Sequence, residues 1–176
     1  MKNKNKFYLS ISIVLVLIIS SSLYVGLNRD NIYTPSKIEE FKINNFEAKE
    51  LNSNKKINFY EISNNNKFII LNIWASWCLP CRSEHEYMME LSKINKSFII
   101  GINYKDKKNN AKSFIAQLGN PYDIILIDDD GLISIELGAY GVPETYIFNN
   151  RDKKLIKKFI GPIDKMKLKE ISKILK

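Results

Sequence analysis

The stretch Trp77-Cys78-Leu79-Pro80-Cys81 contains both cysteines of this 176-residue chain. Two thiols separated by two residues can close a small disulfide and open it again, which is a redox reaction. A static cross-link is the alternative, but so short a loop removes little conformational entropy from the unfolded chain. The pair therefore indicates redox chemistry rather than a structural disulfide.

The cysteines lie between a predicted strand and a predicted helix. Residues 68–74 (FIILNIW) are mostly apolar and rich in β-branched side chains, as in a buried strand. Residues 82–95 contain no Gly or Pro and carry apolar residues at helical spacing. The free N–H groups and the positive dipole end of a helix lower the pKa of a thiol at such a junction. We therefore expect Cys78 to be the attacking thiolate and Cys81 the resolving thiol.

An uncharged apolar run covers residues 7–27, after Lys2, Lys4 and Lys6. About 21 residues at ~1.5 Å each give ~32 Å, enough to cross a hydrocarbon core of ~30 Å. Lysines before the run place the N-terminus in the cytoplasm. A cleaved signal peptide is the alternative, although its apolar core would normally be shorter. We expect a cytoplasmic N-terminus and single-span anchor in residues 1–30 and one folded domain in residues 31–176.

The size and charge of the domain limit its class. The remaining ~145 residues suit one compact domain with a sizeable core. The net charge is +8, but the lysines are spread along the chain and their local clusters include acids. We therefore expect no nucleic-acid partner, and at most a modest attraction to anionic lipid headgroups.

Further strands and helices alternate along the domain. A strand at 97–103 would return parallel to the first through the helix, and a later pair reads as an antiparallel hairpin. The expected strands are 41–43, 57–60, 97–103, 122–127, 145–148 and 155–160, the expected helices are 110–118, 131–137 and one capped by Asp164, and a turn is expected at 64–66. This order predicts an α/β fold with a central mixed sheet flanked by helices.

The element order, with W-C-x-x-C after the first main strand, resembles thioredoxin. Four stretches are similar to the membrane-anchored thioredoxins of cytochrome c maturation, the DsbE/CcmG family: 74–85 (WASWCLPCRSEH), 103–106 (NYKD), 118–122 (LGNPY) and 138–145 (GAYGVPET). The resemblance runs from about Ile32 to the C-terminus, and the expected anchor fits it.

This resemblance implies a thiol:disulfide oxidoreductase on the periplasmic side of a bacterial inner membrane. Its catalytic pair would be Cys78 and Cys81, without a cofactor or a metal. The implied substrate is the C-x-x-C-H disulfide of apocytochrome c, or another cytochrome c maturation protein. The implied electron donor is a membrane thiol transporter of the DsbD or CcdA type.

The resemblance also assigns supporting residues around the cysteines. Pro143 matches the cis-proline position of the family, and a cis bond would place the Val142 backbone beside the cysteines, ready to pair with an extended substrate. Pro80 keeps the thioredoxin-type proline before the second cysteine. Trp77 is expected to form a surface platform for docking proteins.

Two acids are candidates for tuning the dithiol. Glu144 matches a family acid near the active site and is expected to shuttle protons or tune the thiols rather than hold the fold together, with a solvated strand-end acid as the alternative. Glu84, three residues after Cys81, either tunes the site or lies on the helix surface. Asn72 stands where ordinary thioredoxin has a buried acid, so another group must act as base if one is needed.

Other functions remain open. His85, the only histidine, could join the cysteines around a metal, but a packed or surface histidine is the favoured interpretation. A general disulfide reductase of the TlpA/ResA kind shares the same fold, anchor and motif. A copper carrier for oxidase assembly would typically space its cysteines C-x-x-x-C, unlike this chain. A purely structural anchor protein would not need an exposed dithiol.

Overall fold

The computed structural model describes residues 2–27, 42–53, 55–62, 66–94 and 96–176. The chain divides into two units, Met1–Ser36 and Lys37–Lys176. In the first unit, α1 (Lys2–Leu27) is a single helix. Its segment Lys6–Gly26 has a mean hydropathy of 2.2 and is long and apolar enough to cross a membrane, by length and composition.

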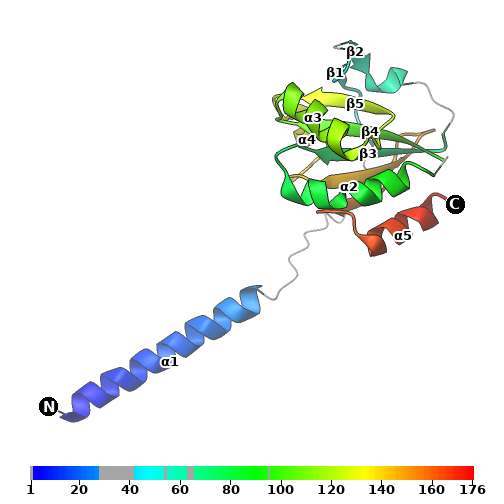
Figure 1. Cartoon of the computed structure of the whole chain (residues 1–176). Helices are drawn as coiled ribbons and strands as arrows, with labels where there is room; N and C mark the ends of the chain where they lie inside the picture. Colours follow the sequence, from blue (N-terminus) through cyan, green and yellow to red (C-terminus); the bar gives the residue numbers. More distant parts are fainter. Residues whose placement is uncertain (1, 28–41, 54, 63–65, 95) are drawn as a thin grey trace. The chain divides into compact units, whose positions relative to one another are not determined.

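The second unit is built on one mixed sheet of seven strands in the order β2-β1-β5-β4-β3-β6-β7 (Figure 1). The strands are β1 (Glu47–Glu50), β2 (Lys56–Asn58), β3 (Phe68–Trp74), β4 (Ser97–Tyr104), β5 (Ile124–Asp128), β6 (Glu144–Asn149) and β7 (Leu155–Ile160). The central three, β3, β4 and β5, are parallel, and every other pairing is antiparallel. The expected thioredoxin-like α/β fold is confirmed.

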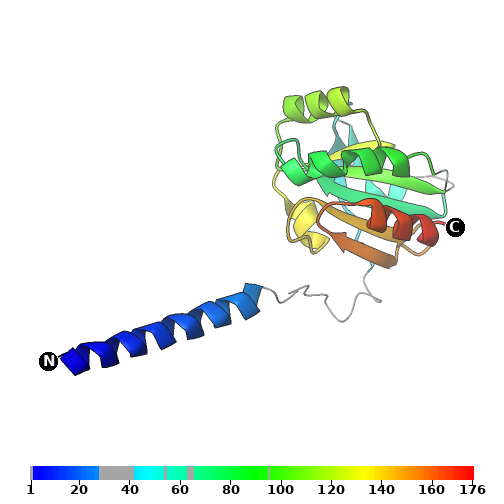
Figure 2. The same cartoon turned by 60° about the horizontal axis from the view of Figure 1, so that its bottom comes forward.

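Helices pack against both faces of this sheet. In Figure 2 the green helix of residues 79–91 and the red helix of residues 165–174 lie in front of the strands. The helices on the two faces are α2 (Leu79–Leu91), α3 (Lys108–Leu118), α4 (Leu132–Glu136) and α5 (Lys165–Ile174). One core joins the sheet to α2, α3 and α5 through buried side chains such as Met88, Phe114 and Ile171. The core on the opposite face includes Phe46 and Leu137, with α4 packed against it. Two crossovers of the same hand explain why α2 and α3 share a face.

The helix after the cysteines is α2. It starts at Leu79 and ends at Leu91, and Cys78 is its N-cap. Pro80 is tolerated in the first turn because the N–H groups there have no partner within the helix. This start places Cys81 inside the first turn, as expected.

The region before β3 differs from the prediction. Residues 57–60 were expected to form a strand, but β2 ends at Asn58 and a 3-10 helix, η2 (Phe59–Glu61), follows. The Asn58 side chain accepts a hydrogen bond from the N–H of Tyr60 (3.0 Å), and this side-chain cap turns the chain out of the strand. Residue 41 and residues 64 and 65 of the expected strand and turn lie outside the described residues.

The C-terminal elements agree with the prediction. Strands β6 and β7 pair as an antiparallel hairpin. Asp164 caps α5 by accepting a hydrogen bond from the N–H of Lys167 (2.8 Å). The parallel strands β3, β4 and β5 end at one edge of the sheet, the edge where sites form in open α/β sheets. The cysteines follow β3 at this edge.

Candidate redox site

Cys78 and Cys81 form a disulfide at the start of α2. The backbone N–H of Cys81 donates to the Sγ of Cys78 (3.0 Å). In the reduced protein the same N–H and the positive end of the 13-residue helix would favour a thiolate on Cys78. The expected assignment of Cys78 as the attacking thiol therefore has a structural basis in the helix start.

The disulfide lies below an exposed apolar rim. Cys78 is 4% exposed and Cys81 is 2% exposed, whereas Trp77 is 58% and Leu79 is 77% exposed. The two flanking side chains are the ones that an approaching protein meets first. The expectation that Trp77 lies at the surface is confirmed, and which thiol is more accessible after reduction stays a prediction.

A second segment that the resemblance singled out precedes β6. The Val142–Pro143 peptide bond is cis, as expected. Pro143 is buried, Val142 is half-buried, and Gly141 is exposed. Val142 packs against both cores, one of which also contains the two cysteines.

Glu84 lies in the interior, only 1% exposed, so the surface-acid alternative for it is wrong. Glu84 lies on the buried face of α2, and Cys81 lies on the same face three residues before it. Its Oε1 accepts a hydrogen bond from Asn72 Nδ2 (3.0 Å), and its Oε2 accepts one from the N–H of Ile163 (2.7 Å). Glu84 is therefore a buried acid, one turn along α2 from the redox-active Cys81.

Two further side chains complete the network around Asn72. Its Nδ2 also donates to Thr145 Oγ1 (3.0 Å), and its Oδ1 accepts from the Tyr122 hydroxyl (2.8 Å). The Tyr122 ring in turn stacks on Trp74, with centroids 5.6 Å apart. Ordinary thioredoxin has a buried acid at the position of Asn72. In this chain the Asn72 amide is instead hydrogen-bonded to a buried acid from α2, Glu84.

Burial raises the pKa of Glu84 from 4.5 to about 7, although its two hydrogen bonds and the charge of Lys167 act in the opposite direction. Burial also raises the pKa of Tyr122, and the Glu84 charge adds to this effect. An acid with a pKa near neutrality can give up or take a proton under physiological conditions, which suits proton transfer to or from a thiol.

The raised pKa of Glu84 predicts a pH-dependent stability. Below about pH 4.5 the acid is protonated in both states, and as the pH rises toward 7 only the unfolded state releases its proton freely. The free energy of unfolding should therefore fall by about 3 kcal/mol across this window relative to Glu84→Gln, since each pKa unit is worth ~1.4 kcal/mol. Urea unfolding at several pH values measures this difference.

The matched control for this prediction is Glu86→Gln, because Glu86 is an exposed acid on the same helix. It should keep the pH dependence of the parent protein. If Glu84→Gln also keeps that dependence, the pKa of Glu84 is the same in the folded and unfolded states and is not raised by burial.

Glu144 is buried in a separate cluster. Along β6, Glu144 and Tyr146 point to the opposite face of the sheet from Thr145, which bonds Asn72 on the α2 face. The Glu144 Oε2 atom accepts from the Tyr146 hydroxyl (2.7 Å) and pairs with Lys158 Nζ (2.9 Å). These contacts show that Glu144 is not a solvated acid. They give it a structural role, which the sequence did not predict.

This cluster also fixes the loop before Pro143. Glu144 Oε1 accepts from the N–H of Tyr140 (2.8 Å), and Lys158 Nζ donates to the Gly138 carbonyl (2.7 Å). The ammonium group of Lys158 lies 4.5 Å from the centroid of the Tyr140 ring. Both members of the ion pair therefore hold the segment that leads to Val142 and Pro143.

His85 is a packed residue. Its Nε2 lies 3.0 Å from the Gly119 carbonyl oxygen, and its ring meets Phe114 edge to face. Burial lowers its pKa. The histidine thus joins α2 to the end of α3, in agreement with the favoured interpretation of it as a packed residue.

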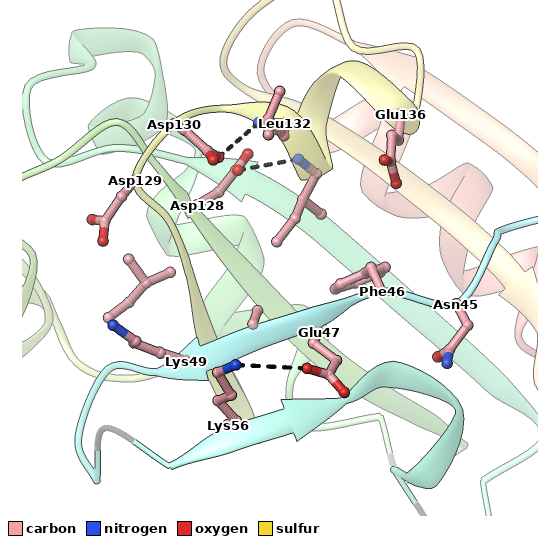
Figure 3. Close-up of a pocket in the computed structure, with 13 residues that line it drawn as sticks. Asn45, Phe46, Glu47, Lys49, Lys56, Asp128, Asp129, Asp130, Leu132 and Glu136 are labelled. Carbon is pink, nitrogen blue, oxygen red and sulfur yellow. Dashed lines mark hydrogen bonds and ion pairs between the residues drawn. The ribbon is translucent and has the colours of Figure 1, made fainter.

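An open pocket of about 460 Å³, whose lining includes neither cysteine, lies between β1 and the start of α4 (Figure 3). Two of its acids bind backbone N–H groups, Asp128 that of Ile133 (3.2 Å) and Asp130 that of Leu132 (3.1 Å). Glu47 pairs with Lys56 at 3.9 Å across exposed strands. None of the lining residues is a predicted site residue, so this pocket is separate from the redox site.

Comparison with known proteins agrees with this geometry. The model of the Redoxin family matches residues 37–175. The chain belongs to the redoxin family. Within it, the chain is a member of the DsbE group of thiol:disulfide interchange proteins, since it is 34% identical over 152 residues to the DsbE protein of Tatumella citrea, covering 84% of this chain and 82% of that protein.

Other relatives of this redoxin match over shorter stretches. It is 45% identical over 104 residues to the thiol:disulfide interchange protein CycY of Rhizobium leguminosarum bv. viciae, covering 59% of this chain and 55% of CycY. The match to DsbE of Escherichia coli strain K12, at 45% over 83 residues, covers 47% of this chain and 44% of that protein. The redoxin thus spans about half the length of these two relatives.

Solved structures share the fold of the redoxin. A DsbF homologue from Corynebacterium diphtheriae has a TM-score of 0.64 at 22% identity, covering 81% of this chain and 97% of that one. StoA from Bacillus subtilis has a TM-score of 0.56 at 23% identity, covering 73% of this chain and 96% of that one.

The sequence did not indicate several residues that surround the redox site in this redoxin. Tyr122 and Thr145 complete the network of Asn72, and Lys158 pairs with Glu144. The family stretches that contain Tyr122 and Thr145 were the available signal, whereas nothing in the local pattern marked Lys158.

Proposed function

We propose that this redoxin is a membrane-anchored reductase of disulfides in apocytochrome c, acting in cytochrome c biogenesis. The observation that carries the proposal is the Cys78–Cys81 disulfide at the start of α2, beside the exposed Trp77. A general reductase would share this centre. The resemblance of residues 103–106 and 138–145 to the DsbE/CcmG family supports the C-x-x-C-H disulfide as the substrate.

The reaction transfers two electrons from the dithiol to the substrate. The Cys78 thiolate attacks one substrate sulfur, so a mixed disulfide forms, the substrate disulfide breaks, and the released substrate sulfur takes a proton. Cys81 then attacks the Cys78 sulfur, which closes the Cys78–Cys81 disulfide and releases the second substrate sulfur as a thiol. A membrane donor of the DsbD or CcdA type returns two electrons to the pair.

Supporting residues act on docking and on protons. Glu84, with a pKa of about 7, can take the proton that Cys81 loses as it attacks. The Gly141–Val142 backbone beside β6 offers an edge for an extended substrate, and Trp77 offers an apolar platform. The contacts of Glu144 place its carboxylate on the face of the sheet opposite to α2. That Glu144 tunes the dithiol therefore stays a prediction.

The apolar helix α1 supports the proposed location. Its apolar segment Lys6–Gly26 would anchor the chain in the inner membrane, with residues 37–176 on the periplasmic side. This side is the oxidising compartment in which a C-x-x-C-H pair becomes a disulfide and needs a reductant.

The test uses the full-length chain carrying Cys81→Ser, which cannot complete the second step. Expressed in bacteria that make c-type cytochromes, this variant should accumulate mixed disulfides through Cys78. Mass spectrometry of the trapped complexes should identify apocytochrome c joined at its C-x-x-C-H segment. Adducts with unrelated exported proteins instead would favour the TlpA/ResA-like reductase, and an absence of adducts would contradict the redox role.

A further inference from the structure

The Asn103–Asp106 stretch (NYKD) lies beside the redox centre. It begins with the last two residues of β4, of which Asn103 is in register with Trp74, the last residue of β3. The two parallel strands thus bring this loop next to Ser76 and Trp77, which lead directly into Cys78. No step of the proposed reaction uses it.

The Asp106 carboxylate joins this loop to the segment before the cysteines. Its Oδ2 accepts from the N–H of Ser76 (2.6 Å) and from Asn103 Nδ2 (3.0 Å). Its Oδ1 accepts from the Ser76 hydroxyl (2.7 Å) and from the N–H of Lys107 (2.8 Å). Three of these donors are N–H groups, and each carboxylate oxygen accepts from at least one of them. An amide at this position would place its NH₂ donor against an N–H donor, so a carboxylate fits the site better.

Trp77 is held by the same loop. Its indole Nε1 donates to the Lys105 carbonyl (3.1 Å), although the side chain is largely exposed. Lys105 has a φ of 43°, in the left-handed region that side chains rarely adopt. The N–H of Lys105 donates to the Asp128 carbonyl (2.9 Å), which ties this conformation to the end of β5.

The chain between these anchors and the disulfide is short and hydrogen-bonded. The N–H of Cys78 donates to the Ala75 carbonyl (3.2 Å), which closes a turn over Ser76 and Trp77. A displacement of Ser76 would therefore shift the indole of Trp77 and the N-cap of α2 together. The carboxylate that fixes Ser76 thus controls the surface around the attacking sulfur.

We propose that Asp106 is a positioning residue that fixes the Ser76–Trp77 turn so that the Trp77 platform is ready for a protein substrate. The inference rests on the proposed function, because it assumes that Trp77 docks the substrate. It assigns to the NYKD stretch a part in the recognition of polypeptide disulfides, separate from the reactivity of the sulfur itself.

The test compares Asp106→Asn with the parent full-length protein in detergent, after reduction of the dithiol. Two probes are used, an oxidised synthetic C-x-x-C-H peptide and the small disulfide of 2-hydroxyethanethiol. The rate constant for the peptide should fall at least tenfold, a change of ~1.4 kcal/mol. The rate constant for the small disulfide should stay within about twofold, because that probe does not need the platform.

A second readout reports on the indole itself. Acrylamide should quench Trp77 more strongly in Asp106→Asn, since the Lys105 contact loosens, while the buried Trp74 contributes little. Ser76→Ala, which removes one hydrogen bond without changing a charge, should shift both readouts in the same direction by less. It replaces Asp106→Asn if that variant does not fold.

Asp123→Asn is the matched control. The Asp123 carboxylate accepts a hydrogen bond from the N–H of Ile99 (2.7 Å), near the opposite end of β4 from the NYKD loop. This variant should lower the thermal midpoint and leave both rate constants and the quenching unchanged. A peptide rate constant in Asp106→Asn like that of the parent, or an equal loss with both probes, would overturn the positioning role.

Failure of the proposed function gives a different pattern. A parent protein that reduces neither probe would contradict the reductase and the docking role with it. Quenching would then still report whether Asp106 fixes the indole.

Discussion

Cys78→Ser should abolish reduction of an oxidised C-x-x-C-H peptide, whereas Cys81→Ser should stop the reaction after its first step. A serine hydroxyl at position 78 is no nucleophile toward a disulfide, because the thiolate performs this attack. Position 78 also holds the N-cap of α2, where its sulfur accepts the N–H of Cys81. A serine oxygen can accept that hydrogen bond, so the helix should persist.

The measurement follows the peptide thiols by mass spectrometry with the reduced full-length chain. Cys81→Ser should yield one covalent peptide adduct per protein chain through Cys78, and Cys78→Ser should yield neither product nor adduct. Circular dichroism serves as the control for folding. Adducts that form at Cys81 in the Cys78→Ser variant, at the rate of the Cys81→Ser variant, would reverse the assigned roles.

Lys158→Met should lower the free energy of unfolding by about 3–5 kcal/mol, because it leaves the Glu144 carboxylate buried without its cation. Glu144 is 1% exposed, and its Oε2 lies 2.9 Å from Lys158 Nζ. The substitution also removes the hydrogen bond to the Gly138 carbonyl and the contact with the Tyr140 ring. Urea unfolding at neutral pH measures the change.

The neighbouring residue supplies the control. Lys157 pairs with Glu170 at 3.1 Å, but both side chains are about half exposed, so Lys157→Met should cost ~1 kcal/mol or less. Adding Glu144→Gln to Lys158→Met should restore part of the loss, since the double variant contains no unpaired charge. Equal effects of the two lysine variants would mean that the buried pair contributes no more than a surface pair.

Local sequence patterns predicted the elements that carry the site. The apolar run 68–74 became β3, the hairpin and α5 formed where expected, and both cysteines lie at the strand-to-helix junction. These features depend on residue spacing within one element or one turn. Such spacing is visible in the sequence because neighbours along the chain determine it.

One error arose where a side chain bonded the backbone locally. The Asn58 amide redirected the chain into η2, where residues 59 and 60 were expected to continue a strand. Periodicity does not register such competition, because a single polar side chain decides it.

The sequence by itself determined the chemistry of this redoxin, a dithiol that can open and close at the start of a helix. The tertiary structure alone decided which polar groups surround it. The partners of Asn72 are 12, 50 and 73 residues away along the chain, at Glu84, Tyr122 and Thr145. Folding removed Glu84 and Glu144 from water and brought Glu144 into an ion pair with Lys158. No local pattern encodes contacts between residues so far apart along the chain.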